Sequence, residues 1–146
     1  MNYHKLSYDT SSTVIFNWDT TLYQFPNNSD PLPLTQEDIK LTDSLLKISI
    51  DSFNKHNPLK EMFDNTLHPI EPLDINLSNY KKQFFPYLDV NFEKVVFINC
   101  VCNKHIHSDW KKKPLEGRLH SGICQFLVKI NLTTKNFYEF SIGGYG

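Results

Sequence analysis

A chain of 146 residues is long enough to form a domain whose hydrophobic core needs neither a metal nor a disulfide to fold. Its net charge of −1 and lack of a recognisable motif argue against a nucleic-acid-binding protein. No apolar run approaches the roughly 20 residues of a membrane-spanning helix. The charge is uneven, because residues 1–79 carry 5 basic and 11 acidic side chains and residues 80–146 carry 10 and 5. Such asymmetry is typical of an interaction surface or of two solvated faces of opposite sign.

The start of the chain predicts short β segments before a loop. Residues 1–12 are polar and are expected to be flexible within a single domain that covers residues 1–146. Residues 14–18 and 22–25 are rich in β-forming side chains, so they predict a hairpin or one bent strand. A loop rich in turn residues, including three prolines, follows at residues 26–33.

One long helix is predicted after this loop. Thr35 is a suitable N-cap, and acidic residues follow it in the first turn. Apolar side chains then recur at helical spacing from Ile39 to Phe53, before Pro58 stops the helix. Residues 59–79 have no clear periodicity and predict a long irregular connection.

The second half of the chain predicts a meander of antiparallel strands. Residues 84–88 form a strand that Pro86 restricts to a sheet edge or a bulge. Residues 95–102 are apolar on both faces apart from one asparagine, which is typical of a central strand. Residues 122–144 alternate between apolar and polar side chains around a polar turn, so they predict a hairpin.

The alternation also assigns the two faces of this hairpin. The inward row of its first strand consists of Cys124, Phe126, Val128, Ile130 and Leu132. In its second strand, Tyr138, Phe140 and Ile142 are expected to share one face, with Glu139 and Ser141 on the other.

One long helix followed by an antiparallel meander of about four to five strands predicts an α+β fold with the helix packed on the sheet. By analogy, this order looks like a cystatin-like fold, which hosts unrelated functions. Over about the C-terminal half, residues 80–84, 97–100, 110–112 and 124–132 resemble a group of small bacterial proteins. No activity is assigned to that group, so the resemblance implies no site residues.

Three cysteines leave three alternatives open. Cys100 and Cys102 lie two residues apart on one strand and point to the same face, and Cys124 lies on the strand expected to pair with it. They could be buried thiols that pack as small hydrophobes, or a cross-strand disulfide to Cys124 formed in an oxidising compartment. A metal site with His105 and His107 is the third alternative. An extended strand separates the two neighbouring sulfurs by roughly 6.5–7 Å, which argues against both of them binding one metal ion. Buried thiols that pack as small hydrophobes are the preferred alternative.

The charged loop at residues 104–121 is the main candidate for a binding surface. Its aromatic and basic side chains are Trp110, Lys111, Lys112, Lys113 and Arg118. These residues would dock an acidic protein partner with Trp110 as the anchor. Alternatively, the lysines solvate the loop while Trp110 packs back over the sheet edge. Phe85 and Tyr87, on the predicted edge strand, are further candidates for contact with a partner.

No nucleophile with a suitably placed base stands out, so no catalytic residue and no cofactor are assigned. We therefore interpret the chain as a non-catalytic protein-binding module of the inhibitor or immunity type. One alternative is a ligand-binding or enzymatic domain with a pocket between helix and sheet that residues 59–79 cover. Another is a Cys/His metal-binding protein. Without an apolar signal core the start predicts a cytoplasmic protein, or a periplasmic or lipoprotein-derived one if Met1 replaces a removed leader.

Overall fold

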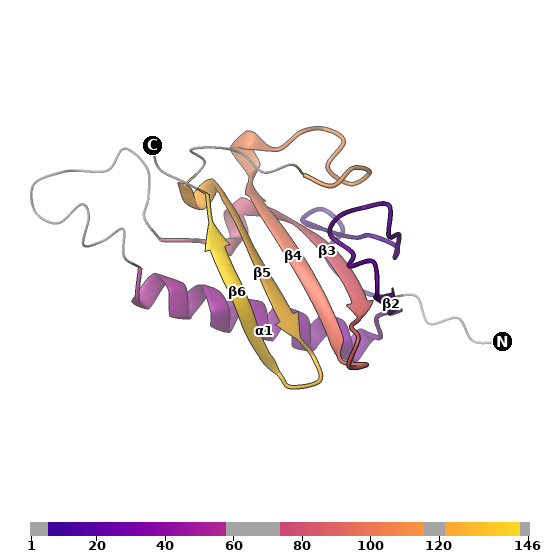
Figure 1. The fold of residues 1–146 in the computed structure, drawn as a ribbon. Helices are drawn as coiled ribbons and strands as arrows, with labels where there is room; N and C mark the ends of the chain where they lie inside the picture. Colours follow the sequence, from indigo (N-terminus) through magenta and orange to yellow (C-terminus); the bar gives the residue numbers. More distant parts are fainter. Residues whose placement is uncertain (1–5, 58–73, 116–121, 144–146) are drawn as a thin grey trace, which may run out of the picture.

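One helix lies across one face of a six-stranded mixed sheet in the computed structural model, which describes residues 6–57, 74–115 and 122–143 (Figure 1). The helix, α1, spans Gln36–Lys55. The sheet has the order β1-β3-β4-β5-β6, and β2 pairs with β3 on the same side as β1. The predicted α+β class is therefore confirmed, whereas the cystatin-like analogy stays a prediction.

The strands β3 to β6 form the predicted antiparallel meander, and β1 joins β3 in parallel. The six strands are β1 (Thr13–Ile15), β2 (Asp30–Pro31), β3 (Tyr80–Leu88), β4 (Lys94–Cys102), β5 (Gln125–Asn131) and β6 (Asn136–Ile142). Three short 3-10 helices lie before or after these strands: η1 (Leu77–Asn79), η2 (Asn103–His105) and η3 (Gly122–Cys124). The sheet is therefore mixed and not purely antiparallel.

The start of α1 follows the local chemistry of the sequence. The Thr35 side chain accepts a hydrogen bond from the Asp38 amide at 3.1 Å, and the Asp38 carboxylate accepts one from the Thr35 amide at 3.0 Å. This capping box satisfies two amides that have no partner inside the helix. The buried side of α1 presents Ile39, Leu46 and Ile50 to the sheet. The predicted helix is confirmed.

The N-terminal β segments are shorter than predicted. Residues 14–18 contribute only to β1, and residues 20–25 form turns. The Asp19 carboxylate accepts hydrogen bonds from the amide and the hydroxyl of Thr21 at 2.9 and 2.7 Å, and the Phe25 amide donates to Leu22 O. Such local bonds compete with strand formation, so the predicted hairpin or bent strand is wrong here.

Pro86 lies in a gap between two pairing partners of β3. The last β1 pair is Ile15 with Phe84, and the first β2 pair is Pro31 with Tyr87. Pro86 has no amide hydrogen to donate, so it is tolerated where no neighbouring strand pairs on that side. Since β4 pairs along the other side without a shift of register at Pro86, β3 is an inner strand with a local gap, and the predicted edge or bulge is wrong.

A β-bulge in β6 changes which side chains face the helix. Lys129 pairs with Tyr138 and Leu127 pairs with Ser141, so β6 contains one residue more than β5 between these pairs. Glu139, at the bulge, has a φ of 53°. The extra residue reverses the alternation. Phe140 consequently packs on the helix side while Tyr138 packs on the opposite face, so the predicted common face for these two residues is wrong.

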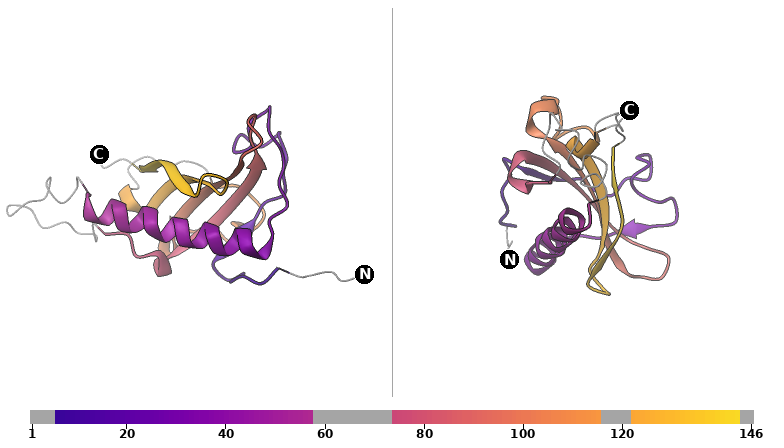
Figure 2. Two further views of the ribbon diagram at one scale, coloured as in Figure 1. Left: turned by 90° about the horizontal axis from the view of Figure 1, so that it is seen from below. Right: turned by 90° about the vertical axis from the view of Figure 1, so that its left-hand side faces the viewer.

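The sheet curves around α1 on one face and carries loops on the other (Figure 2). The core between sheet and helix contains most of the buried apolar residues, among them Leu46, Phe84, Ile98 and Phe126. Smaller clusters on the opposite face centre on Phe85 and on residues 101–115. No helix in the described ranges is both long and apolar enough to cross a membrane.

Candidate binding surface

The chain between the end of β4 and residue 115 carries the described part of the predicted binding loop. We call residues 104–115 the basic segment (the orange loop in Figure 1). Trp110 packs there against Val101 and Leu115, with Val14 and Ile106 beside it, and is only 7% exposed. Trp110 therefore holds the segment on the sheet, as in the second sequence alternative, and is not the exposed anchor of the first.

The buried side chain of Gln83 on β3 ties the segment to the sheet. Its Nε2 donates to Trp110 O at 2.7 Å and to Lys113 O at 2.8 Å. Its Oε1 accepts a hydrogen bond from the Leu115 amide at 2.8 Å. One amide side chain thus fixes three backbone positions of the basic segment, and we call this arrangement the Gln83 clamp.

Two further buried amides extend the clamp across the sheet. Asn99 on β4 donates from Nδ2 to Leu115 O at 3.1 Å. Gln125 on β5 donates from Nε2 to Asn99 Oδ1 at 3.4 Å. Buried polar groups are stable only when they are hydrogen-bonded, so this cluster specifies where the segment lies. The basic segment is therefore held in place by hydrogen bonds from both β3 and β4.

The lysines of the segment remain on the surface. Lys111, Lys112 and Lys113 are all exposed. Lys81 Nζ and Lys111 Nζ lie 5.8 and 5.5 Å from the centre of the Trp110 ring, at the distance of a cation–π contact. Lys113 Nζ lies 3.7 Å from Asp109 Oδ2, and this ion pair is solvent-exposed and contributes little to stability. The result is a positively charged surface on a fixed backbone.

The other predicted partner contacts are not part of this surface. Phe85 and Tyr87 are buried in an aromatic cluster with Phe25. The Phe85 ring stacks on the Phe16 ring, with the two ring centres 4.8 Å apart. Phe85 and Tyr87 pack under the turns at residues 20–25, so the expectation that they contact a partner is not met by this structure. Burial raises the pKa of the Tyr87 hydroxyl well above its usual value. Arg118 lies outside the described residues.

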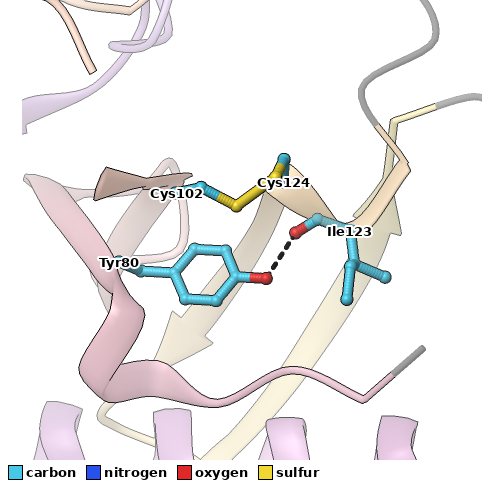
Figure 3. Close-up of a disulfide and its surroundings, with 4 residues drawn as sticks. All are labelled: Tyr80, Cys102, Ile123 and Cys124. Carbon is cyan, nitrogen blue, oxygen red and sulfur yellow. Dashed lines mark hydrogen bonds between the residues drawn. A yellow bond between two sulfur atoms is a disulfide. The ribbon is translucent and has the colours of Figure 1, made fainter. Parts of the chain in front are cut away.

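A disulfide joins Cys102 to Cys124 at one end of the sheet, with the two Cα atoms 4.8 Å apart (Figure 3). Cys124 belongs to η3, just before β5, and is not within the strand as predicted. Beside the disulfide, the Tyr80 hydroxyl donates to Ile123 O at 2.7 Å. Among the sequence alternatives the disulfide is thus the one that the structure contains, and simple packing holds only for the buried thiol of Cys100.

The metal alternative finds no support in the arrangement of the ligands. No cluster of three or more His, Cys, Asp or Glu side chains suited to a metal exists among the described residues. The Cys102 sulfur is bonded to another sulfur and provides no thiolate, while burial raises the pKa of the Cys100 thiol. His105 and His107 are on the surface.

A cavity of about 550 Å³ opens beside the disulfide. Its apolar floor is formed by Tyr80, Cys102, Ile123 and Cys124. Its polar rim comes from Asp74, Asn76, Asn79, Asn103 and Lys104. The sequence predicted a pocket between helix and sheet under residues 59–79. The cavity lies instead at the end of the sheet, and only residues 74–79 of that segment belong to the described chain.

Sequence reasoning missed the role of Gln83. On the helix-distal face of β3, Gln83 is followed by the buried aromatic residues Phe85 and Tyr87, and a buried glutamine beside them signals a polar partner. Asn99 is the one polar residue among residues 95–102, but the sequence does not show that both amides meet the same loop. Only the register of β3 and β4, which pairs Gln83 with Asn99, brings them together.

The basic segment, the disulfide and the cavity are therefore interpreted from their own geometry. The resemblance to small bacterial proteins and the inhibitor or immunity-type role stay predictions. Comparison of the chain with protein families, with curated proteins and with solved structures finds no match.

Proposed function

We propose that the chain is a protein-binding module whose basic segment docks an acidic surface of a partner protein. The observation that carries this proposal is the Gln83 clamp, which fixes the backbone from which three exposed lysines project. An inhibitor or immunity-type protein would be one form of such a module.

Two physical arguments support this function. A surface that is already ordered loses little conformational entropy on binding, so more of the contact energy appears as affinity. Clustered surface charges accelerate association with an oppositely charged partner and disfavour partners of like charge. The asymmetric distribution of charge along the sequence adds to this argument, because its basic half supplies the segment.

Replacement of Lys111, Lys112 and Lys113 by glutamine is expected to raise the Kd for the acidic partner about tenfold. Each exposed charge contributes about 0.5 kcal/mol, and 1.4 kcal/mol corresponds to a tenfold change. The partner is first captured on immobilised protein, and the affinity of the purified pair is then measured by calorimetry at low and high salt. Salt should weaken wild-type binding more than binding of the triple variant.

The matched control replaces three exposed lysines of α1 by glutamine: Lys40, Lys47 and Lys55. This variant loses the same charge but keeps the basic segment, so its Kd should stay near that of the wild type. Equal losses of affinity in the two variants would mean that net charge matters and that the segment is not the docking site.

The cavity beside the disulfide favours a second candidate function, the binding of a small ligand. Its volume of about 550 Å³ is within the range of ligand sites, and an apolar floor with amides at the rim suits a small amphipathic molecule. Native mass spectrometry of protein incubated with a small-molecule extract should then detect an adduct that an Ile123→Trp variant lacks. An absent adduct, or one that persists in this variant, would contradict binding in the cavity.

A further inference from the structure

The disulfide closes the base of the basic segment. Cys102 is the last residue of β4, and Cys124 is the last residue before β5 begins. The two cysteines are 22 positions apart in the chain, and the basic segment lies between them. The disulfide therefore holds together the two points at which this part of the chain leaves the sheet and returns to it.

The hydrogen-bonded ladder between β4 and β5 ends just inside the disulfide. Its last pair is Val101 with Gln125, so Cys102 and Cys124 flank this pair on its outer side. Beyond it, η2 starts at Asn103 and leads into the basic segment. The Gln83 clamp fixes the far part of the segment, at residues 110–115. The near part, at residues 104–109, comes soon after the disulfide-bonded Cys102 in the chain.

A small reductant has a path to this disulfide. Cys102 and Cys124 are 9% and 4% exposed, and both line the cavity of about 550 Å³. Cys100, on the same strand, is fully buried in the core and has no such access. An external thiol can therefore attack the disulfide while the third cysteine takes no part in the exchange.

We propose that the Cys102–Cys124 disulfide is a redox latch that controls the basic segment, so that the oxidised protein binds its acidic partner more tightly than the reduced protein. The inference rests on the proposed function, because it regulates the same surface. A dithiol reductant attacks one sulfur as a thiolate and forms a mixed disulfide, and its second thiol then releases the protein. Two electrons and two protons pass to the protein, which gains two thiols, while the reductant becomes a cyclic disulfide.

Hydrogen–deuterium exchange tests the latch without any partner. The folded protein is treated with dithiothreitol, the free thiols are counted by alkylation and mass spectrometry, and exchange is followed for seconds to minutes. Peptides that cover residues 103–110 should lose protection on reduction, at least severalfold in exchange rate, and should regain it on reoxidation. Peptides from α1 should stay protected at these short times. A variant with Cys102→Ala and Cys124→Ala should resemble the reduced protein, and Cys100→Ala should resemble the oxidised one.

Three results of the reduction and exchange experiment would overturn the latch. The first is a disulfide that dithiothreitol reduces only after unfolding, and the second is equal exchange of residues 103–110 in both forms. The third is loss of protection in α1 as well, which would mark a general structural role. Failure of the proposed function is a separate observation, namely unchanged affinity of the oxidised triple lysine variant. If the latch opens and partner affinity is the same in both redox forms, the regulatory claim is wrong.

Discussion

Replacement of Gln83 by methionine is expected to lower the free energy of unfolding by about 3 kcal/mol. The two side chains have similar volumes, so the change leaves the packing intact but removes three hydrogen bonds. Each buried group left without a partner costs about 1–3 kcal/mol, here two carbonyl oxygens and one amide. Urea denaturation measures the loss, and hydrogen exchange should show residues 110–115 losing their protection.

A matched control exists in the same molecule. Gln24 is only 5% exposed, and neither atom of its side-chain amide has a hydrogen-bond partner within the structure described. Replacement of Gln24 by methionine should therefore leave the free energy of unfolding unchanged or raise it, because a buried amide without partners is unfavourable. Equal destabilisation by both substitutions would show that the hydrogen bonds of Gln83 do not matter and that only volume or shape does.

Removal of the disulfide by the double substitution Cys102→Ala and Cys124→Ala should also lower the free energy of unfolding by about 3 kcal/mol. A cross-link over 22 residues restricts the unfolded chain, and the chain-entropy model gives a stabilisation of this size. Chemical denaturation of the oxidised wild type and the double variant measures the difference. Cys100→Ala is the control, since it removes a buried thiol without changing any cross-link.

Thiol counting checks the premise of this prediction. Alkylation of the unfolded, unreduced protein should modify one cysteine, and reduction should raise the number to three. Three modified cysteines without reductant would mean that the disulfide is absent. In that case the two alanine substitutions should lower the free energy of unfolding only by the amount expected for the loss of small buried side chains.

The elements that follow local rules could be predicted from the sequence. The Thr35 cap and the apolar spacing of α1 are local features, and the helix begins where they place it. The alternation of Phe126, Val128 and Ile130 likewise identified the buried face of β5, because period two leaves only two faces to choose from.

The elements that depend on contacts between distant residues could not be predicted in this way. The bulge at Glu139 arises from pairing with β5 and has no local signal such as glycine. The choice between disulfide, packing and metal depends on how close Cys102 and Cys124 come, which the strand register and η3 decide. For the candidate surface, the sequence identified the lysines but not the Gln83 clamp that fixes them.

The bulge at Glu139 also bears on how separate molecules of this protein meet one another. β6 is the last strand of the sheet, and its outer edge has no pairing strand among the described residues. A straight, uncharged edge strand can pair with a strand of another molecule and so promote aggregation. Bulges and charged side chains on the edge strand disfavour such pairing. β6 has both, because Glu139 interrupts the strand and its exposed carboxylate pairs with Lys129 at 3.0 Å. The same residue that reverses the alternation of β6 therefore discourages edge-to-edge association at high concentration.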